Sequence, residues 1–476
     1  MFLRIIFSPL GIKICSLSKM QNSLLLDLYE LTMAQAYFIY KPDTAATFDL
    51  FVRGLPKNRS YLVAAGLTSI LYYIKELKFS SDDLLYLKKQ KLFTQDFLRY
   101  LAHFRFRGDI WAMREGEIFF AAEPVLRVTA PIIEAQLIES FLLNTINLES
   151  MIASKASRVA EAAQDKLVFD FSLRRTHGPL AAVMVARSAY LAGFHGTSNV
   201  LAGKLYKIPI AGTMAHSFVM SFKAELDSFL AYSEVFPKRT ILLVDTYNTR
   251  IGIENAVKIG LYLRAKGHRL MGVRLDSGDI VTLSKLARKL LDKAGLNFVR
   301  IFASGNLDEF RINELLKKGA EVDSFGVGTN MGTSEDAPSL DVIYKISEVT
   351  DEYGKFLPTM KLSHAKVTYP GRKQVLRVQD RKGRFVRDIL CLEKDPTLAR
   401  RGWVRGKPLL IKVVEGGRII YKSPGLDKIR AYCKFNLNHF PQGLKEVYST
   451  FRYPVEISPG LKKLRQNLSK ELIQRQ

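Results

Sequence analysis

The pattern of apolar and polar positions first separates an N-terminal part of the chain. Residues 24–40 are apolar and helix-favouring, and the alternation over 46–53 predicts a strand. Residues 82–105 and 131–160 predict helices. Between them, 109–130 contain short strands broken at Glu115-Gly116-Glu117 and Glu123-Pro124, which is typical of antiparallel structure. The pattern predicts a β-rich α+β domain over residues 20–150.

The pattern changes near residue 165. Helix-like segments at 249–266, 281–294 and 308–318 separate short apolar runs, and such strand–helix alternation predicts a parallel sheet, open or closed into a barrel. The runs are Leu167–Phe171, Ile208–Ala211, Ile241–Val244, Leu270–Val273, Val299–Ala303 and Val322–Gly326. After 350, strands and turns rich in Gly, Pro and Arg return. We therefore predict an α/β domain over 151–350 and a basic, β-rich region over 351–476 that packs with the N-terminal domain.

Composition narrows the class of protein. The three cysteines among 476 residues are far apart, which argues against a disulfide framework or a cysteine zinc site and favours a reducing cytoplasm. The net charge is +25, and residues 351–476 carry about 28 basic against about 11 acidic side chains. Their basic runs lack interleaved aromatics, so a solvated basic surface is favoured over nucleic-acid binding, which stays as an alternative.

The first nineteen residues are basic and apolar and contain no acidic residue. Pro9 and Lys13 interrupt the apolar stretch, which therefore makes a poor signal sequence and is too short to span a bilayer. A disordered extension over 1–19 is the preferred interpretation, with Met20 as a possible start. No other segment reaches membrane-spanning length without charges.

The run at 272–279, Gly-Val-Arg-Leu-Asp-Ser-Gly-Asp, suits an anion site better than a core. Arg274 offers a fork of N–H donors for a phosphate, and Gly278 lets a ligand approach the backbone. Asp276 and Asp279 can hold ribose hydroxyls or a hydrated Mg²⁺.

Polar, glycine-containing clusters follow the other runs as well. Ligands sit at the C-terminal ends of strands in barrels and open α/β sheets, so we expect these clusters to meet at one site. They are Ser172–Gly178, Gly212–Ser217, Asp245–Thr249, Ser304–Asn306 and Gly326–Asn330.

From about Leu26 to Ile346 the chain resembles nicotinate phosphoribosyltransferase, a type II phosphoribosyltransferase. The motifs that carry the resemblance are Asp27–Met33, Phe171–Arg175, Gly196–Gly203, Gly212–Ser217, the 272–279 run and Phe325–Thr329. The resemblance implies an irregular, TIM-like α/β barrel joined to a β-rich domain built from both chain ends. It also implies a cytoplasmic homodimer that acts in NAD salvage, without membrane or nucleic-acid partners.

The implied reaction condenses nicotinate with phosphoribosyl pyrophosphate to give nicotinate mononucleotide and pyrophosphate, coupled to ATP hydrolysis, as a ligase or glycosyltransferase that uses Mg²⁺. No strong base is required, because the pyridine nitrogen is already nucleophilic. Displacement of pyrophosphate places charge on the sugar and the leaving group, which arginine, Mg²⁺ and backbone N–H groups stabilise.

The resemblance also implies residue roles. His216 is the residue that becomes a phosphohistidine, and it forms the catalytic set with Arg274 and Asp276. Tyr29, from the neighbouring subunit, stacks on the pyridine ring opposite Phe171, and Thr213 contacts nicotinate beside Arg274. The remaining implied site residues are Arg174, Ser217, Ser304, Gly305, Gly328 and Thr329 at substrate, chiefly phosphate, and Asp245 and Asp279 at ribose and Mg²⁺.

Ser198 bears on the choice between acid and amide substrate. Related nicotinamide enzymes carry an aspartate there, which would accept a hydrogen bond from an amide and repel the nicotinate carboxylate. Ser198 therefore favours nicotinate, with nicotinamide and quinolinate phosphoribosyltransferase as alternatives. The chain departs from the family at Leu26, often Thr, and at Asn330, often Arg, which bears on the phosphate site.

Overall fold

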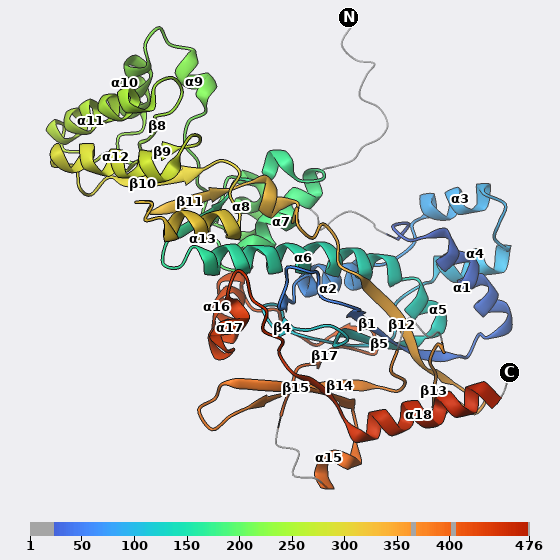
Figure 1. The fold of residues 1–476 in the computed structure, drawn as a ribbon. Coiled ribbons are helices and arrows are strands. Elements are labelled where there is room, and N and C mark those ends of the chain that lie inside the picture. The colour runs from blue at the N-terminus through green and yellow to red at the C-terminus, as the bar shows by residue number, and fades with distance from the viewer. Residues whose placement is uncertain (1–22, 363–367, 401–405, 475–476) are drawn as a thin grey trace, which may run out of the picture.

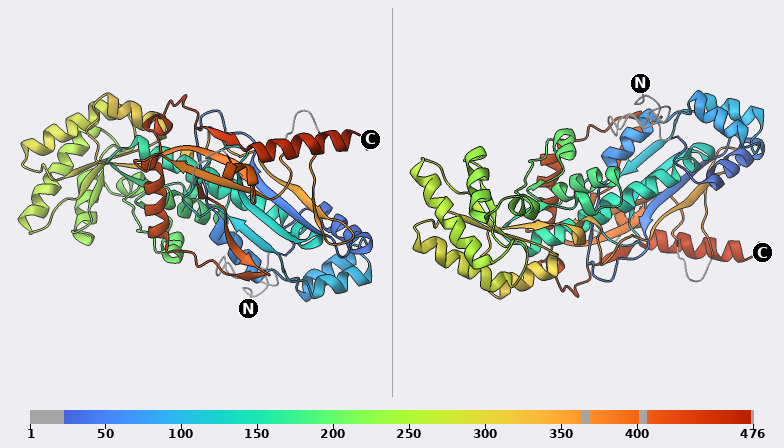
Figure 2. Two further views of the ribbon diagram at one scale, coloured as in Figure 1. Left: turned by 90° about the horizontal axis from the view of Figure 1, so that it is seen from below. Right: turned by 90° about the horizontal axis from the view of Figure 1, so that it is seen from above.

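The computed structural model describes residues 23–362, 368–400 and 406–474. The extension predicted over residues 1–19 lies outside them. A barrel-like α/β unit occupies one end of the molecule in Figure 1, and an antiparallel seven-stranded sheet and a mixed four-stranded sheet occupy the other, with one long helix between. Both views in Figure 2 place these parts at opposite ends.

A seven-stranded antiparallel sheet is built from both ends of the chain. Its order is β13-β12-β1-β5-β3-β17-β18. The strands are β1 (Ala45–Val52), β3 (Asp109–Ala112), β5 (Pro124–Pro131), β12 (Val342–Thr350), β13 (Phe356–Pro358), β17 (Ile411–Glu415) and β18 (Arg418–Ile419). Phe48 of β1 stacks on Tyr344 of β12 with ring centroids 4.6 Å apart. Strand β12 falls within the segment predicted as barrel, yet it pairs along β1 and belongs to this sheet.

Two smaller sheets complete the β-rich part. The four-stranded sheet has the order β16-β14-β15-β19, and β2 pairs with β4. Their strands are β2 (Leu62–Val63), β4 (Ile118–Phe119), β14 (Lys373–Gln379), β15 (Phe385–Leu392), β16 (Lys407–Pro408) and β19 (Val455–Ile457). The C-terminal helices are α15 (Pro396–Arg400), α16 (Leu426–His439), α17 (Gln442–Lys445) and α18 (Pro459–Gln474).

The six-stranded sheet is parallel, with the order β7-β6-β11-β10-β9-β8. Its strands are β6 (Leu167–Asp170), β7 (Gly196–Thr197), β8 (Ile241–Leu243), β9 (Gly272–Leu275), β10 (Arg300–Ser304) and β11 (Ser324–Val327). The run at 208–211 forms no strand and contributes only an isolated bridge between Ile210 and Thr197. The sheet ends at β7 on one edge and at β8 on the other. No strand of the described chain pairs with both of these edge strands, so the barrel is open between them.

Helices connect the parallel strands. They are η2 (Leu173–Arg175), α7 (Pro179–Leu191), α8 (Val200–Tyr206), α9 (His216–Met220), α10 (Glu225–Val235), α11 (Thr249–Ala265), α12 (Ile280–Lys293), α13 (Glu309–Lys317) and α14 (Thr329–Gly332). Parallel strands require such crossovers. The predicted α/β class is confirmed, with parallel strands in the barrel and a β-rich part drawn from both chain ends.

Two predicted helices are each divided in two. The 82–105 segment forms α3 (Ser81–Lys89) and α4 (Gln95–Ala102). Thr94 caps α4 by accepting a hydrogen bond from the Phe97 N–H, and Lys91 adopts a left-handed φ of 58° between the helices. The 131–160 segment forms α5 (Ile132–Gln136) and α6 (Glu139–Ala162). The apolar pattern conceals that break because Leu137 and Ile138 between these helices are themselves buried.

Helix α6 lies between the barrel and the seven-stranded sheet (Figure 1). It packs on α7 and α13 of the barrel and on β2 and β12 of the antiparallel sheets, so most of its surface is buried. The other N-terminal helices are α1 (Leu28–Tyr40) and α2 (Leu67–Glu76).

Candidate functional site

Arg274 organises the carboxyl ends of the parallel strands. It lies within β9 rather than after it, and its Nε donates to Ser304 Oγ at the end of β10 over 2.8 Å. Nη1 donates to Thr213 Oγ1 at 3.1 Å, and Nη2 donates to Asp276 Oδ1 at 2.5 Å. The guanidinium carbon lies 5.7 Å from the centroid of the Phe171 ring. This largely buried cation thus joins the 272–279 run to two other predicted clusters, Gly212–Ser217 and Ser304–Asn306, beside the Phe171 ring.

Asp276 is linked to a second carboxylate. Its backbone N–H donates to Asp245 Oδ2 at 2.9 Å, and Ser277 Oγ donates to the same oxygen at 2.6 Å. Burial alone would raise the pKa of Asp276, but Arg274, Ser304 and His216 together hold it below its ordinary value. Asp245 Oδ1 is buried and has no hydrogen-bond partner in the described structure. A buried carboxylate oxygen of this kind calls for a donor or a cation.

His216 is the first residue of α9 and its side chain is 39% exposed. Its Nδ1 lies 3.1 Å from Thr246 Oγ1, just beyond β8, and its Nε2 lies 3.8 Å from Asp276 Oδ2. Thr246 therefore orients the ring through a hydrogen bond at Nδ1, and the Asp276 carboxylate lies near Nε2 without a direct hydrogen bond.

Two glycines permit close contacts at the strand ends. A Cβ on Gly305, whose φ is +90°, would lie 2.1 Å from the Asp276 carbonyl oxygen. A Cβ on Gly326 would lie 2.5 Å from the ring of Phe171, which stacks on Phe302 with centroids 6.1 Å apart. Neither position has room for a side chain, so these glycines fix the backbone around Asp276 and Phe171.

Other predicted residues lie around the same edge. Ser198 follows β7, is half-buried, and its N–H donates to the Asp170 carbonyl at 2.8 Å. Gly328 precedes α14 and Thr329 begins it. Asn330 is half-buried in the same short helix, whereas Arg174 in η2, Ser217 in α9 and Thr329 are exposed.

Two predicted site residues lie elsewhere. Asp279 is exposed and caps α12, with Oδ1 accepting from the Val281 N–H at 3.2 Å and Oδ2 from Thr282 Oγ1 at 2.5 Å. Tyr29 lies on α1, at the opposite end of the molecule from β8 and β9 in both figures. Burial and the carboxylates of Glu139 and Glu30 raise the pKa of the 45%-exposed Tyr29 side chain, which keeps its phenol neutral.

Some residues that support the site carry only a weak sequence signal. Asp170 is buried at the end of β6, where Ser172 Oγ and Thr197 Oγ1 donate to it at 2.5 and 2.7 Å. Burial raises its pKa, and these hydrogen bonds oppose that rise. The position of Asp170 at the end of an apolar run is a sequence signal that could have identified it. Thr246 could have been identified because it directly follows the predicted site residue Asp245.

Sequence comparisons cover nearly the whole described chain. Profiles of the nicotinate phosphoribosyltransferase N-terminal domain, family and C-terminal domain match residues 24–147, 167–380 and 402–465. The nicotinate phosphoribosyltransferase pncB2 of Mycobacterium tuberculosis is 45% identical over 442 residues, 92% of each chain. This chain belongs to the nicotinate phosphoribosyltransferase family. The Bacillus subtilis nicotinate phosphoribosyltransferase is 37% identical over 92% of this chain and 93% of its own.

A solved structure of the family extends the agreement to the fold. The crystal structure of human nicotinic acid phosphoribosyltransferase superposes with a TM-score of 0.82 at 28% identity, covering 93% of this chain and 99% of the human one. The resemblance found in the sequence, which left the last 120 residues unmatched, is confirmed and extended by the C-terminal domain match.

The described residues lack two features. None of their helices combines the length and apolarity needed to cross a bilayer. They also contain no group of three or more His, Cys, Asp or Glu side chains placed to hold a metal ion.

Proposed function

We propose that the protein condenses nicotinate with phosphoribosyl pyrophosphate to form nicotinate mononucleotide and pyrophosphate in NAD salvage, with ATP hydrolysis coupled through a phosphohistidine. The observation that carries the proposal is the Arg274 cluster, in a chain of this family. It joins Thr213, Ser304 and Asp276 at the ends of adjacent parallel strands.

The pyridine nitrogen attacks C1 of the ribose, the C1–O bond to pyrophosphate breaks, and the electron pair leaves with pyrophosphate. Arg274 then faces the anionic substrate or the ribose phosphate beside it, and Phe171 forms one wall for the pyridine ring. Gly305, Gly328 and Thr329 would present backbone N–H groups to phosphates, with Arg174 supplying charge. Such preorganised donors stabilise the negative charge that develops on the leaving group.

Asp245 and Asp276 suit the ribose hydroxyls and Mg²⁺. The free, buried Asp245 Oδ1 is the position where a hydroxyl donor or a cation fits best. Mg²⁺ would neutralise the charge that gathers on pyrophosphate. Asp279 is a weaker candidate ligand, because capping of α12 already occupies both of its oxygens.

His216 would accept the γ-phosphoryl group of ATP. A ring nitrogen forms the N–P bond, the P–O bond to ADP breaks, and ADP leaves; water later hydrolyses the phosphohistidine. Thr246 and Asp276 contact opposite sides of the ring and would hold it for attack. Ser217 follows His216 on the exposed side of α9, where it can contact the same phosphoryl group.

A homodimer would bring Tyr29 to the site. Helix α1, which carries Tyr29, lies at the opposite end of the molecule from β8 and β9, so Tyr29 would stack on nicotinate opposite Phe171 from a neighbouring subunit. Exposed Leu25 and Leu28 adjoin Tyr29 in the chain, which supports a contact surface there. A reducing cytoplasm agrees with the two buried free thiols, Cys391 and Cys433.

The proposal is tested by incubating the purified chain with phosphoribosyl pyrophosphate and Mg²⁺, with and without ATP, and with nicotinate, nicotinamide or quinolinate. We expect mononucleotide from nicotinate at a rate that ATP increases, measured by chromatography. Absence of product from nicotinate would overturn the proposal, and product from quinolinate or nicotinamide instead would favour the corresponding alternative. Salt-sensitive nucleic-acid binding would be an additional property.

Ser198→Asp should reduce selectivity for the acid substrate. A carboxylate at this half-buried position would repel the nicotinate carboxylate, so we expect kcat/KM for nicotinate to fall at least about tenfold, which is about 1.4 kcal/mol. The matched control is Ser198→Asn, which has nearly the same shape without the charge. Equal losses in the two variants would show that shape, rather than charge, selects the substrate at this position.

A further inference from the structure

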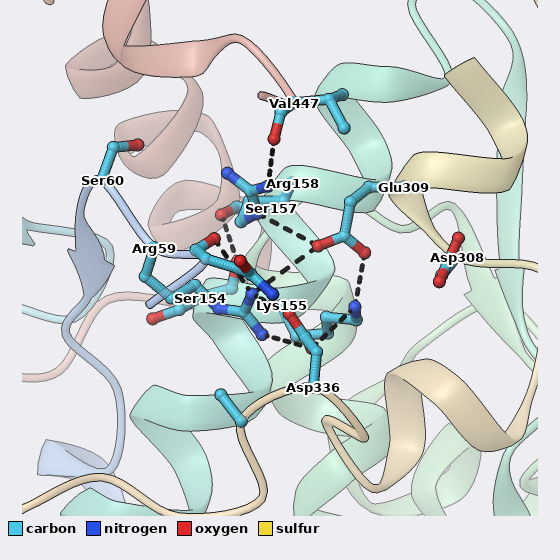
Figure 3. Close-up of polar contacts among 12 residues, drawn as sticks. Arg59, Ser60, Ser154, Lys155, Ser157, Arg158, Asp308, Glu309, Asp336 and Val447 are labelled. Carbon is cyan, nitrogen blue, oxygen red and sulfur yellow. Dashed lines mark hydrogen bonds and ion pairs between the residues drawn. The ribbon is translucent and has the colours of Figure 1, made fainter. Parts of the chain in front are cut away.

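Four buried charged side chains and one partly exposed carboxylate, that of Asp336, form a cluster where α6 meets the start of α13 and the segment after α14. This buried charge cluster consists of Arg59, Lys155, Arg158, Glu309 and Asp336. Lys155 Nζ contacts Glu309 Oε2 at 2.5 Å and Asp336 Oδ1 at 2.9 Å. Arg59 Nη1 contacts Asp336 Oδ2 at 2.6 Å, and Arg158 Nε donates to Glu309 Oε1 at 3.1 Å. Figure 3 shows both carboxylates pointing into this group of cations, whereas Asp308 points away from it.

The cluster joins parts of the chain that are far apart in sequence. Arg59 follows β1, and Lys155 and Arg158 lie on α6. Glu309 begins α13, five residues after Ser304 at the end of β10, and Asp336 lies seven residues after Thr329. Glu309 thus lies where the loop from Ser304-Gly305 enters α13. Asp336 lies in the segment that leaves α14, the short helix that begins at Thr329 after Gly328.

Further contacts restrain these loops from the same side. Arg59 Nη2 donates to Ser334 Oγ at 3.1 Å, and Arg158 Nη2 donates to the Val447 carbonyl at 2.7 Å. Lys155, Arg158 and Glu309 are each at most 2% exposed. Burial would raise the pKa of Asp336, but Arg59 and Lys155 lower it well below its ordinary value, so the carboxylate stays ionised. The attraction between two buried charges is stronger than the attraction between the same charges in water, because the effective dielectric constant is lower.

The expected result of so many buried charges is a cost in desolvation rather than a gain in stability. A cluster retained only for stability would be replaceable by apolar packing. The cluster instead ties α6 to Glu309 and Asp336, which lie a few residues after the Ser304-Gly305 and Gly328-Thr329 pairs proposed to bind phosphate.

We propose that the buried charge cluster is a positioning device for phosphoribosyl pyrophosphate, in which Lys155 holds the Ser304-Gly305 loop and the Gly328-Thr329 loop at the spacing that its phosphates require. This inference rests on the proposed function and on the placement of phosphate at those loops. Lys155 is a positioning residue, because it acts through Glu309 and Asp336 and not by contact with substrate.

Lys155→Met is the sharpest test. The cluster holds three cations and two carboxylates, so removal of Lys155 leaves the remaining charges balanced while breaking the link between the loops. We expect the KM for phosphoribosyl pyrophosphate to rise about tenfold, with the KM for nicotinate changing less than about twofold. Amide hydrogen exchange should accelerate in both loops, measured by mass spectrometry.

A matched control comes from a second buried cluster, in which Arg377 pairs with Glu117 at 2.5 Å and Asp388 at 2.6 Å. The second cluster holds two carboxylates and one guanidinium, so Glu117→Gln removes one negative charge and leaves the remaining pair balanced. It should lower Tm without changing either KM. If it raises the KM for phosphoribosyl pyrophosphate as Lys155→Met does, the effect is one of general stability and the proposal is wrong.

The other possible outcomes also distinguish the positioning role of Lys155 from the proposed function. A folded Lys155→Met protein with unchanged KM for phosphoribosyl pyrophosphate overturns the positioning role while leaving the proposed function intact, because wild type is assayed alongside. Should wild type form no mononucleotide, the proposed function fails instead. If Lys155→Met does not fold, Ser334→Ala replaces it, because it removes the hydrogen bond from Arg59 and the one that Ser334 Oγ donates to the Ala337 carbonyl, and so loosens the segment that carries Asp336. We then expect about a threefold rise in the same KM, and no rise overturns the proposal.

Discussion

Replacement of Arg274 by alanine is expected to lower kcat/KM for nicotinate mononucleotide formation about 10³-fold, equivalent to about 4 kcal/mol. The variant loses the guanidinium that joins Thr213, Asp276 and Ser304, and leaves the Asp276 carboxylate without its cationic partner. Steady-state kinetics with each substrate varied in turn measure the loss.

The pH profile gives a second readout of the same variant. Arg274 helps to hold the pKa of Asp276 below its ordinary value in the folded protein. Without Arg274 that pKa rises, so the ionised carboxylate is lost at a higher pH as the solution is acidified. The acid limb of the profile should move toward neutrality. Arg274→Lys keeps the positive charge but loses the fork of N–H donors. We therefore expect its acid limb to lie close to that of wild type, while its kcat/KM stays well below the wild-type value.

The second large effect is expected for His216→Ala. ATP should no longer stimulate mononucleotide formation, while a slower ATP-independent reaction persists, because His216 is proposed to carry the phosphoryl group and not to attack the ribose. The measurement compares rates with and without ATP and traps any phosphoprotein formed from γ-labelled ATP. Label that stays on the His216→Ala protein would assign the phosphoryl group to another residue.

Thr246→Val provides a matched control for His216. It removes the hydroxyl 3.1 Å from Nδ1 and leaves the imidazole in place. Phosphorylation should slow without being lost. If Thr246→Val abolishes phosphorylation as completely as His216→Ala does, loss of ring orientation alone accounts for both results.

The strand-end clusters were predictable because each follows an apolar run, and parallel strands place their carboxyl ends together. Arg274 and Asp276 were found in this way, although the strand itself begins later than its apolar run and includes Arg274. Asp279 was predicted as a ligand from the same run, but its spacing before Val281 and Thr282 also makes it a helix cap, and local hydrogen bonds occupy it.

The buried charge cluster left no such signal. Arg59, Lys155 and Asp336 are far apart in sequence and belong to no periodic pattern, so only the tertiary fold brings them together. The break between α5 and α6 was missed for the opposite reason, because the apolar pattern runs through it. The proposed stacking of Tyr29 on the substrate would require a second subunit, and no pattern within one chain encodes such a contact.

Helix α6 has a consequence for how the protein can be divided. Its buried side chains belong to a single apolar core that extends from Leu31 on α1 to Leu461 on α18 and includes the barrel strands. Domain names therefore describe the topology and not separable folding units. A fragment cut on either side of α6 would expose the face that its missing half covers, so expression of the barrel alone is a poor route to an active enzyme.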